Sequence, residues 1–201
     1  MSYQAYGEMD IIELPRPKLK GKVSLEEAIS SRRSVRSYSE RELTMNDISQ
    51  LLWASQGITD EKGLRAAPSA GALYPLEIYI AKKDGIFYYL TDRHRLKKIS
   101  GKDKRSDLAR AAWNQRYIGE APIDIVICAV YKRVMSRYGE RGIRYTDIEV
   151  GHSAENVHLE AVALGLSSVP VGAFDDKEVS GVLGLPEEET PVYIIPVGYR
   201  K

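Results

Sequence analysis

The sequence has few of the residues that hold metal ions or form covalent cross-links. Its only cysteine is Cys128, and its three histidines, His94, His152 and His158, do not lie at the spacing of metal-ligand pairs. A single cysteine excludes an intramolecular disulfide and a multi-cysteine metal centre. Because Cys128 lies within an apolar run, we expect a buried, unreactive thiol. The sequence therefore predicts a fold without bound metal.

The sequence also lacks a charge excess of one sign and a long apolar run. Lysine and arginine total 29 against 28 aspartate and glutamate, which gives a formal net charge of +1. This balance argues against a broad basic face for nucleic acid, although local basic clusters remain. No apolar stretch approaches the ~20 residues of a membrane-spanning helix, and the first ten residues do not resemble a secretory signal. We expect a cytoplasmic protein that binds neither nucleic acid nor membranes.

Several common catalytic motifs are missing as well. The sequence contains no Gly-x-Gly-x-x-Gly or Walker-type loop, so a Rossmann or P-loop nucleotide site has no support. It contains no Gly-x-Ser-x-Gly elbow, which leaves a serine hydrolase unsupported. The sequence therefore gives no support to these classes of nucleotide site and hydrolase.

The composition, in contrast, is that of an ordinary globular protein. Of 201 residues, 43% are hydrophobic and 28% are charged, which suffices for one core without disulfides. We predict a single domain over residues 24–201, preceded by an extended arm over residues 1–23 that is either loose or wrapped on a partner chain. The abundance of charge with scarce Cys, Asn and Gln is also the direction that hyperthermophile sequences take.

Local patterns predict interleaved helices and strands. Ser24 and Thr44 begin capping-box patterns, and Gly57 and Gly165 are helix stops. The longest predicted helix places Val150 in an apolar stripe. The predicted helices span residues 25–32, 44–57, 104–113, 146–164 and 175–183. The predicted strands span residues 76–81, 86–90, 123–131, 167–171 and 190–199, with the first two forming a hairpin. Without a strict βαβ rhythm, this order indicates an α+β fold with a mixed sheet.

The long helix is also expected to have a polar face. That face carries the following residues: Glu149, His152, Glu155 and Glu160.

Two segments could bind a phosphate group. Residues 32–36 (Arg-Arg-Ser-Val-Arg) place three guanidinium groups and a hydroxyl together, and planar guanidinium forks match phosphate oxygens. Residues 198–201 (Gly-Tyr-Arg-Lys) add two cations after a predicted strand. Both segments also have a plain interpretation, because arginines favour a helix C-terminus and charged tails are usually solvated.

Two further segments could line a planar ligand. Residues 68–75 (Pro-Ser-Ala-Gly-Ala-Leu-Tyr-Pro) combine small side chains with two stiffening prolines. Residues 169–174 (Val-Pro-Val-Gly-Ala-Phe) could expose backbone N–H groups between a strand and a helix. As ordinary loops, these segments would need no ligand at all.

Together, five segments in this order resemble the nitroreductase family, and within it the SagB-type branch related to azoline-oxidising enzymes. The resemblance covers the chain from about Ser24 to Tyr199. The five segments span residues 32–38, 51–57, 67–79, 151–157 and 169–175. The resemblance implies an intertwined homodimer with a central, mainly antiparallel sheet flanked by helices. It also implies that FMN is bound between the two chains.

The resemblance also implies roles for individual residues. One group would hold the phosphate, ribityl chain and pyrimidine edge of FMN, a second would line the ring from the partner chain, and a third would face flavin N5. The first group is Arg32, Arg33, Ser34 and Arg36, with Arg200 at the phosphate. The second is Ser69, Ala70, Gly71 and Leu73, and the third is Val171, Gly172 and Ala173. The chemistry would belong to the flavin, so no catalytic side chain is assigned.

The implied activity is the reduction of small electron-poor acceptors, such as nitro compounds or quinones, with NADH or NADPH in a ping-pong cycle. The alternatives are an azoline-type dehydrogenase or oxidase and a non-catalytic flavin-binding protein. The azoline enzymes use a Lys-Tyr pair, whereas the nearest pairs here are Arg137-Tyr138 and Arg144-Tyr145. The substrate lid is expected around residues 102–120 and 131–145.

Overall fold

The computed structural model describes residues 11–201, and its centre is a seven-stranded sheet in the order β1-β4-β3-β2-β5-β7-β6. All six paired neighbours are antiparallel. The strands are β1 (Ile11–Glu13), β2 (Leu76–Lys82), β3 (Gly85–Leu90), β4 (Arg95–Ser100), β5 (Ile123–Ala129), β6 (Ser167–Ser168) and β7 (Thr190–Gly198). This arrangement confirms the predicted α+β class and its mainly antiparallel sheet.

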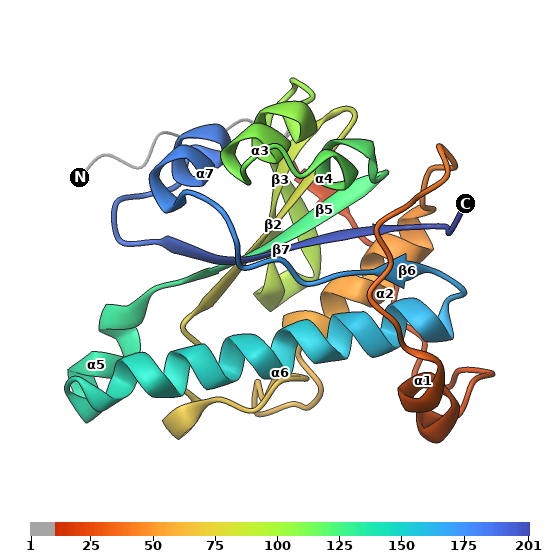
Figure 1. Ribbon diagram of the computed structural model, residues 1–201. Coiled ribbons are helices and arrows are strands. Elements are labelled where there is room, and N and C mark those ends of the chain that lie inside the picture. The colour runs from red at the N-terminus through yellow and green to blue at the C-terminus, as the bar shows by residue number, and fades with distance from the viewer. Residues whose placement is uncertain (1–10) are drawn as a thin grey trace.

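Helices cover both faces of the sheet, as Figure 1 shows. One face carries α2 (Met45–Gln56) and the long α6 (Arg141–Ala163). The short helices α1 (Leu25–Ser31) and α5 (Tyr131–Tyr138) lie near the two ends of α6. The other face carries α3 (Arg105–Ala111), α4 (Arg116–Glu120) and α7 (Asp176–Leu183). None of the helices in residues 11–201 is long and apolar enough to cross a membrane.

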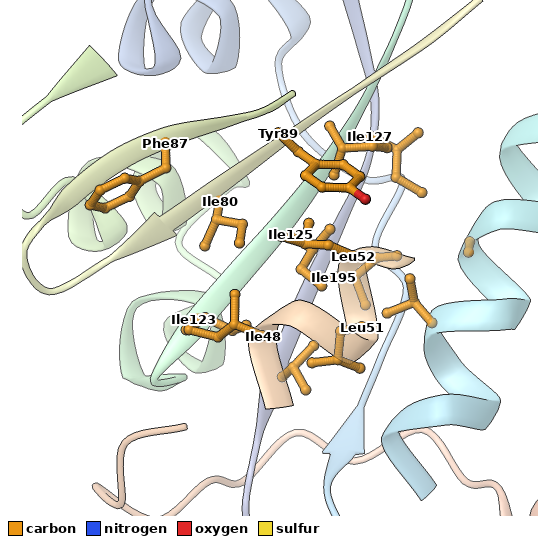
Figure 2. Close-up of a cluster of buried hydrophobic side chains, with 14 of the residues drawn as sticks. Ile48, Leu51, Leu52, Ile80, Phe87, Tyr89, Ile123, Ile125, Ile127 and Ile195 are labelled. Atoms are coloured by element: carbon orange, nitrogen blue, oxygen red, sulfur yellow. The ribbon is translucent and has the colours of Figure 1, made fainter. Parts of the chain in front are cut away.

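The larger core lies between the sheet and the α2–α6 layer. Figure 2 shows Ile48, Leu51 and Leu52 of α2 facing isoleucines of three strands. Because side chains alternate along a strand, Ile125 and Ile127 of β5 enter this core. Val126 and Cys128 enter the second core under α3 and α7. The predicted burial of the Cys128 thiol is confirmed, and burial raises the pKa of this group.

The capping patterns of the sequence are present at the helix starts. In α2, the Thr44 side chain accepts from the Asp47 amide, and the Asp47 carboxylate accepts from the Thr44 amide. Ser24 caps α1 by accepting from the amide of Glu27. Asp175 caps α7 in the same way. These caps explain why the predicted starts of the three helices are correct to within one or two residues.

Other elements differ from the prediction. The predicted helix over residues 104–113 is the shorter α3, and α4 follows after a turn; both pack on the second core. Residues 95–100 form β4, which the sequence pattern did not reveal, and α6 begins at Arg141, before the predicted start at 146. Of the strand expected over residues 167–171, only Ser167 and Ser168 form a strand, β6.

Part of the predicted arm packs on its own chain. Ile11–Glu13 pair with β4, Leu14 is buried, and the Lys18 amide donates to Oε1 of Gln50 at 2.8 Å. These contacts place residues 11–18 against the sheet and α2. The first ten residues of the predicted arm lie outside the described residues.

Candidate functional site

The segment that carries the arginines runs along the free edge of β6 after α1 ends. Ser34 forms a parallel bridge with Ser168, and the Val35 amide donates to the Ser168 carbonyl at 3.1 Å. Tyr38 then bridges Arg200, so the two predicted phosphate-binding segments lie next to each other. Local pairing of a few backbone groups therefore brings together residues that are far apart in the sequence.

Tyr38 fixes the path of this segment. Its buried hydroxyl donates to the carbonyl of Val35 at 2.6 Å and is 3.2 Å from that of Pro196. Burial, and then the nearby Asp124 carboxylate, raise the pKa of the Tyr38 hydroxyl. Tyr38 therefore remains a neutral donor at any physiological pH.

The four predicted phosphate-site cations have different local partners. Arg32 contacts His158 and lies 3.7 Å from Glu155, and Arg33 donates to the carbonyls of Ser30 and Arg32 at the end of α1. Arg36 is exposed, with its guanidinium carbon 5.8 Å from the centroid of the Tyr117 ring. Arg33, Arg36 and Arg200 pair with no carboxylate within the described part of the chain. Unneutralised cations at one place on the surface are suited to an anionic ligand.

His158 lies behind this cationic segment and was not assigned to the site from the sequence. Nη1 of Arg32 is 3.3 Å from Nε2 of His158, and Nδ1 of His158 contacts the Ser168 hydroxyl. Because a guanidinium can only donate, Nε2 accepts and Nδ1 carries the proton. Burial, and then the Arg32 charge, lower the pKa of His158 to about 4. The imidazole is therefore a neutral link between α6, β6 and Arg32.

We predict that His158→Asn removes a pH dependence of stability. The folded-state pKa of about 4 lies below the ordinary 6.5, so the unfolded chain binds a proton first as pH falls. The contribution of His158 to the free energy of unfolding is complete above pH 6.5. It falls by about 2–3 kcal/mol as the pH is lowered towards 4, at 1.36 kcal/mol per pH unit. Urea unfolding of the wild type and of His158→Asn between pH 7 and 4.5 measures this loss of stability. A wild-type-minus-variant difference that stays constant with pH would contradict this prediction.

The loop after β6 reaches the same region. Val171 exchanges two backbone hydrogen bonds with Ile194, at 2.8 and 3.0 Å, so its N–H and C=O groups are already paired. Gly172 and Ala173 follow and are exposed. Nε2 of Gln115 donates to the Ala173 carbonyl at 2.7 Å, and the Tyr117 hydroxyl donates to Oε1 of Gln115. Because Tyr117 also faces Arg36, these contacts connect the loop to the arginine segment.

The remaining predicted segment, residues 68–75, lies elsewhere in the chain. Its turn, η2 (Ala70–Ala72), contains left-handed Gly71 and Ala72, and the Ser69 hydroxyl accepts from the Tyr74 amide at 2.9 Å. Arg133 donates to the Tyr74 carbonyl and to Oε1 of Glu77 at 2.6 Å. The turn is thereby tied to α5 and β2.

A cavity of about 270 Å³ lies between this loop and α6, lined by Ser69, Glu149 and His152 among others. The Glu149 side chain, predicted on the polar face of the helix, is 1% exposed. This part of the prediction was wrong because the loop covers that side of α6. Burial raises the pKa of Glu149 to about 7, against the opposing effects of the Ser69 hydroxyl and of the Arg65 and Arg133 charges.

Loop 68–75 and the arginine segment contact different sides of α6. The loop lies against Glu149, and Arg32 lies against His158. Glu149 and His158 are nine positions apart, about 13 Å and two and a half helical turns, which places them on opposite sides of the helix. One chain therefore holds two separate halves of the predicted site.

Comparisons with known proteins show the family and the fold of the chain. The Nitroreductase family model matches residues 29–199, and the chain belongs to the nitroreductase family, a family of oxidoreductases. A Methanocaldococcus jannaschii protein provisionally named a nitroreductase is 42% identical over 197 residues, covering 95% of this chain and 98% of that protein. An NADPH-flavin oxidoreductase of Vibrio harveyi is 27% identical over 110 residues, which is 51% of this chain and 46% of that enzyme.

Among solved structures, a provisionally named nitroreductase of Ralstonia eutropha has a TM-score of 0.88 at 27% identity, covering 98% of this chain and 93% of that one. The predicted nitroreductase fold is confirmed by this similarity.

The residues 11–201 contain no group of three or more His, Cys, Asp or Glu side chains placed to hold a metal ion.

Proposed function

We propose that this protein is an FMN-dependent oxidoreductase that uses NADH or NADPH to reduce small electron-poor acceptors such as nitro compounds or quinones. The similarity to an NADPH-flavin oxidoreductase supports the cofactor and the reductant. The observation that carries the proposal is the meeting of unpaired arginines with exposed loop backbone at one end of the β6–β7 edge. We also propose a cytoplasmic location, on the basis of the composition.

The residues present fit FMN by the chemistry of their donors. Arg33, Arg200 and the Ser34 hydroxyl offer charged and neutral donors to a phosphate, and Arg36 offers a cation to the pyrimidine edge. Gly172 and Ala173 leave backbone groups accessible beside them, as the polar edge of a planar ring requires. Val171 contributes through its position because its own backbone groups bond to Ile194.

The second half of the site is proposed to come from another copy of the chain. Ser69, Ala70, Gly71 and Leu73 lie across α6 from the arginines, so one ligand cannot reach both within a chain. A partner copy could bring the loop to the arginines. Exposed apolar side chains on α1 and α6 offer a surface for such pairing: Leu25 is 62% exposed, Ile29 55% and Ile148 49%. We therefore propose a homodimer with two shared sites.

When bound, FMN would accept a hydride from the nicotinamide and pass it to the acceptor. The chain then has to bind, orient and shield the reactants. The Arg36 charge would stabilise negative charge at the pyrimidine edge. Burial of the sites in a dimer would exclude water from them.

One observation favours a second candidate, an azoline dehydrogenase of the SagB-type branch. Arg137 and Tyr138 of α5 lie against Gly71, where an added Cβ would be 2.9 Å from Nη1 of Arg137 and 2.8 Å from the Tyr138 hydroxyl. This pair therefore sits beside the proposed ring-lining loop. Reduction of the bound flavin by an azoline-containing peptide, but not by NAD(P)H, would favour this candidate.

The experiment that tests the proposed cofactor is a fluorescence titration of flavin-free protein with FMN and with riboflavin. We expect FMN to bind at one equivalent per chain and at least about a hundredfold more tightly than riboflavin, because riboflavin lacks the phosphate that the arginines would bind. Equal affinity for the two compounds, or binding of neither, would overturn the proposal.

A further inference from the structure

The turn between α3 and α4 is strained and carries an exposed aromatic residue. Trp113 and Asn114 are consecutive non-glycine residues with positive φ, at 54° and 62°, and Trp113 is 66% exposed. A non-glycine residue in this conformation is strained and persists only where its surroundings hold it. The residue that follows them, Gln115, supplies the contacts that hold this turn.

Both ends of the Gln115 amide are used. Nε2 donates to the carbonyl of Ala112 at 2.9 Å, within the turn, and to that of Ala173 at 2.7 Å, across to the loop. Oε1 accepts from the Tyr117 hydroxyl. The reversed amide would put its oxygen against two carbonyl oxygens, so these partners define one orientation.

The partners of Gln115 belong to two different parts of the candidate site. Ala173 lies in the exposed loop after β6, and the Tyr117 ring faces the guanidinium of Arg36. A second bond, from the Asp175 amide to the Ala111 carbonyl at 2.9 Å, anchors the end of the same loop to α3. The α3–α4 turn therefore sets the position of the loop relative to Arg36.

We propose that Gln115 is a positioning residue that holds the Gly172–Ala173 backbone in register with Arg36, so that one FMN molecule can contact both. This inference rests on the proposed function. Gln115 need not touch the flavin, since it acts through the Ala173 carbonyl on one side and through Tyr117 on the other. A strained turn is retained because it presents the Gln115 amide to both partners.

The test uses full-length Gln115→Leu, which keeps the approximate volume and removes all three side-chain hydrogen bonds. We expect FMN to bind about tenfold more weakly, as for loss of roughly one net hydrogen bond of about 1.4 kcal/mol. We also expect faster hydrogen exchange at the amides of residues 172–174 in the flavin-free protein. Tyr117→Phe keeps the ring beneath Arg36 and loses only its hydroxyl, so a smaller weakening of FMN binding is expected.

Glu120→Gln is the matched control, because Glu120 is exposed on the same short helix and its ion pair is with Arg116 one turn away. It should leave FMN affinity and loop exchange unchanged. Should Gln115→Leu fail to fold, Tyr117→Phe carries the test.

The possible outcomes separate the inference from the proposed function. Wild-type FMN affinity and loop exchange in both variants would overturn the role of Gln115 while leaving the flavin site intact. Weaker binding with unchanged loop exchange would also overturn it, because the loss would then not arise from the loop. A wild-type protein that does not bind FMN would overturn the proposed function and this inference with it.

Discussion

Arg36→Ala is expected to weaken FMN binding by roughly a hundredfold while leaving the fold intact. Arg36 is exposed and pairs with no carboxylate among residues 11–201, so its removal leaves no buried charge without a partner. Charge-assisted hydrogen bonds contribute about 1.5–3 kcal/mol, and about 2.8 kcal/mol corresponds to a hundredfold change in affinity. Fluorescence titration of the flavin-free variant measures the dissociation constant, and circular dichroism checks the fold.

The matched control is Arg93→Ala. Arg93 is also exposed, and its recorded ion pair is with its neighbour Asp92 at 3.7 Å, far from the candidate site in the sequence. The control should bind FMN like the wild type. If Arg36→Ala and Arg93→Ala bind FMN equally well, the arginine segment is not the flavin site.

A heterodimer of two defective chains is expected to recover about half of the wild-type flavin content. One chain carries Arg36→Ala, and the other carries Gly71→Val, which puts a β-branched residue at φ 62° and against Tyr138 and Arg137. Each homodimer should bind little FMN. In the heterodimer, the Arg36 of one chain and the intact loop of the other complete one site, while the second site has both defects.

The heterodimer is isolated by co-expression with two different affinity tags and two successive purification steps. Flavin content is read from absorbance after reconstitution with FMN. About one FMN per heterodimer is expected if each site takes residues from both chains. Sites contained within a single chain would give none, since every chain then carries one defect. Heterodimers of Arg36→Ala and wild-type chains serve as the reference for one intact site.

The sequence predicted those elements best where local chemistry sets the boundary. Caps at Ser24, Thr44 and Asp175 define helix starts because a side-chain oxygen satisfies amides that the helix leaves free. The alternating and apolar patterns predicted β2, β3, β5 and β7. Successive side chains of a strand point to opposite faces of the sheet, so the burial of each side chain follows from the local sequence. These elements form most of the core.

The elements and contacts that the sequence did not reveal depend on the tertiary fold. Residues 95–100 are rich in lysine and arginine, and only pairing with β1 and β3 makes them a strand. Glu149 was expected to be solvated, but loop 68–75 covers it. Neither outcome can be read from periodicity, because each depends on a segment distant in the chain.

The candidate site shows the same division. The arginine segment and the loops were recognised by residue type, and the structure brings residues 34–38 beside Arg200. His158 and Gln115 were missed because they act through hydrogen bonds to segments far apart in the chain, and Tyr117 because its ring faces the distant Arg36. The homodimer and the individual flavin contacts remain predictions.

The most direct measurement of the proposed activity is an anaerobic absorbance titration of the FMN-reconstituted protein with NADPH and then with NADH. We predict that the flavin band near ~450 nm bleaches with one or both nucleotides, which is the half-reaction that a flavin-dependent reductase requires. Nucleotide preference follows from the same titration. A fully loaded protein whose band stays unchanged at excess NADPH and NADH would contradict the assignment as an NAD(P)H-dependent reductase.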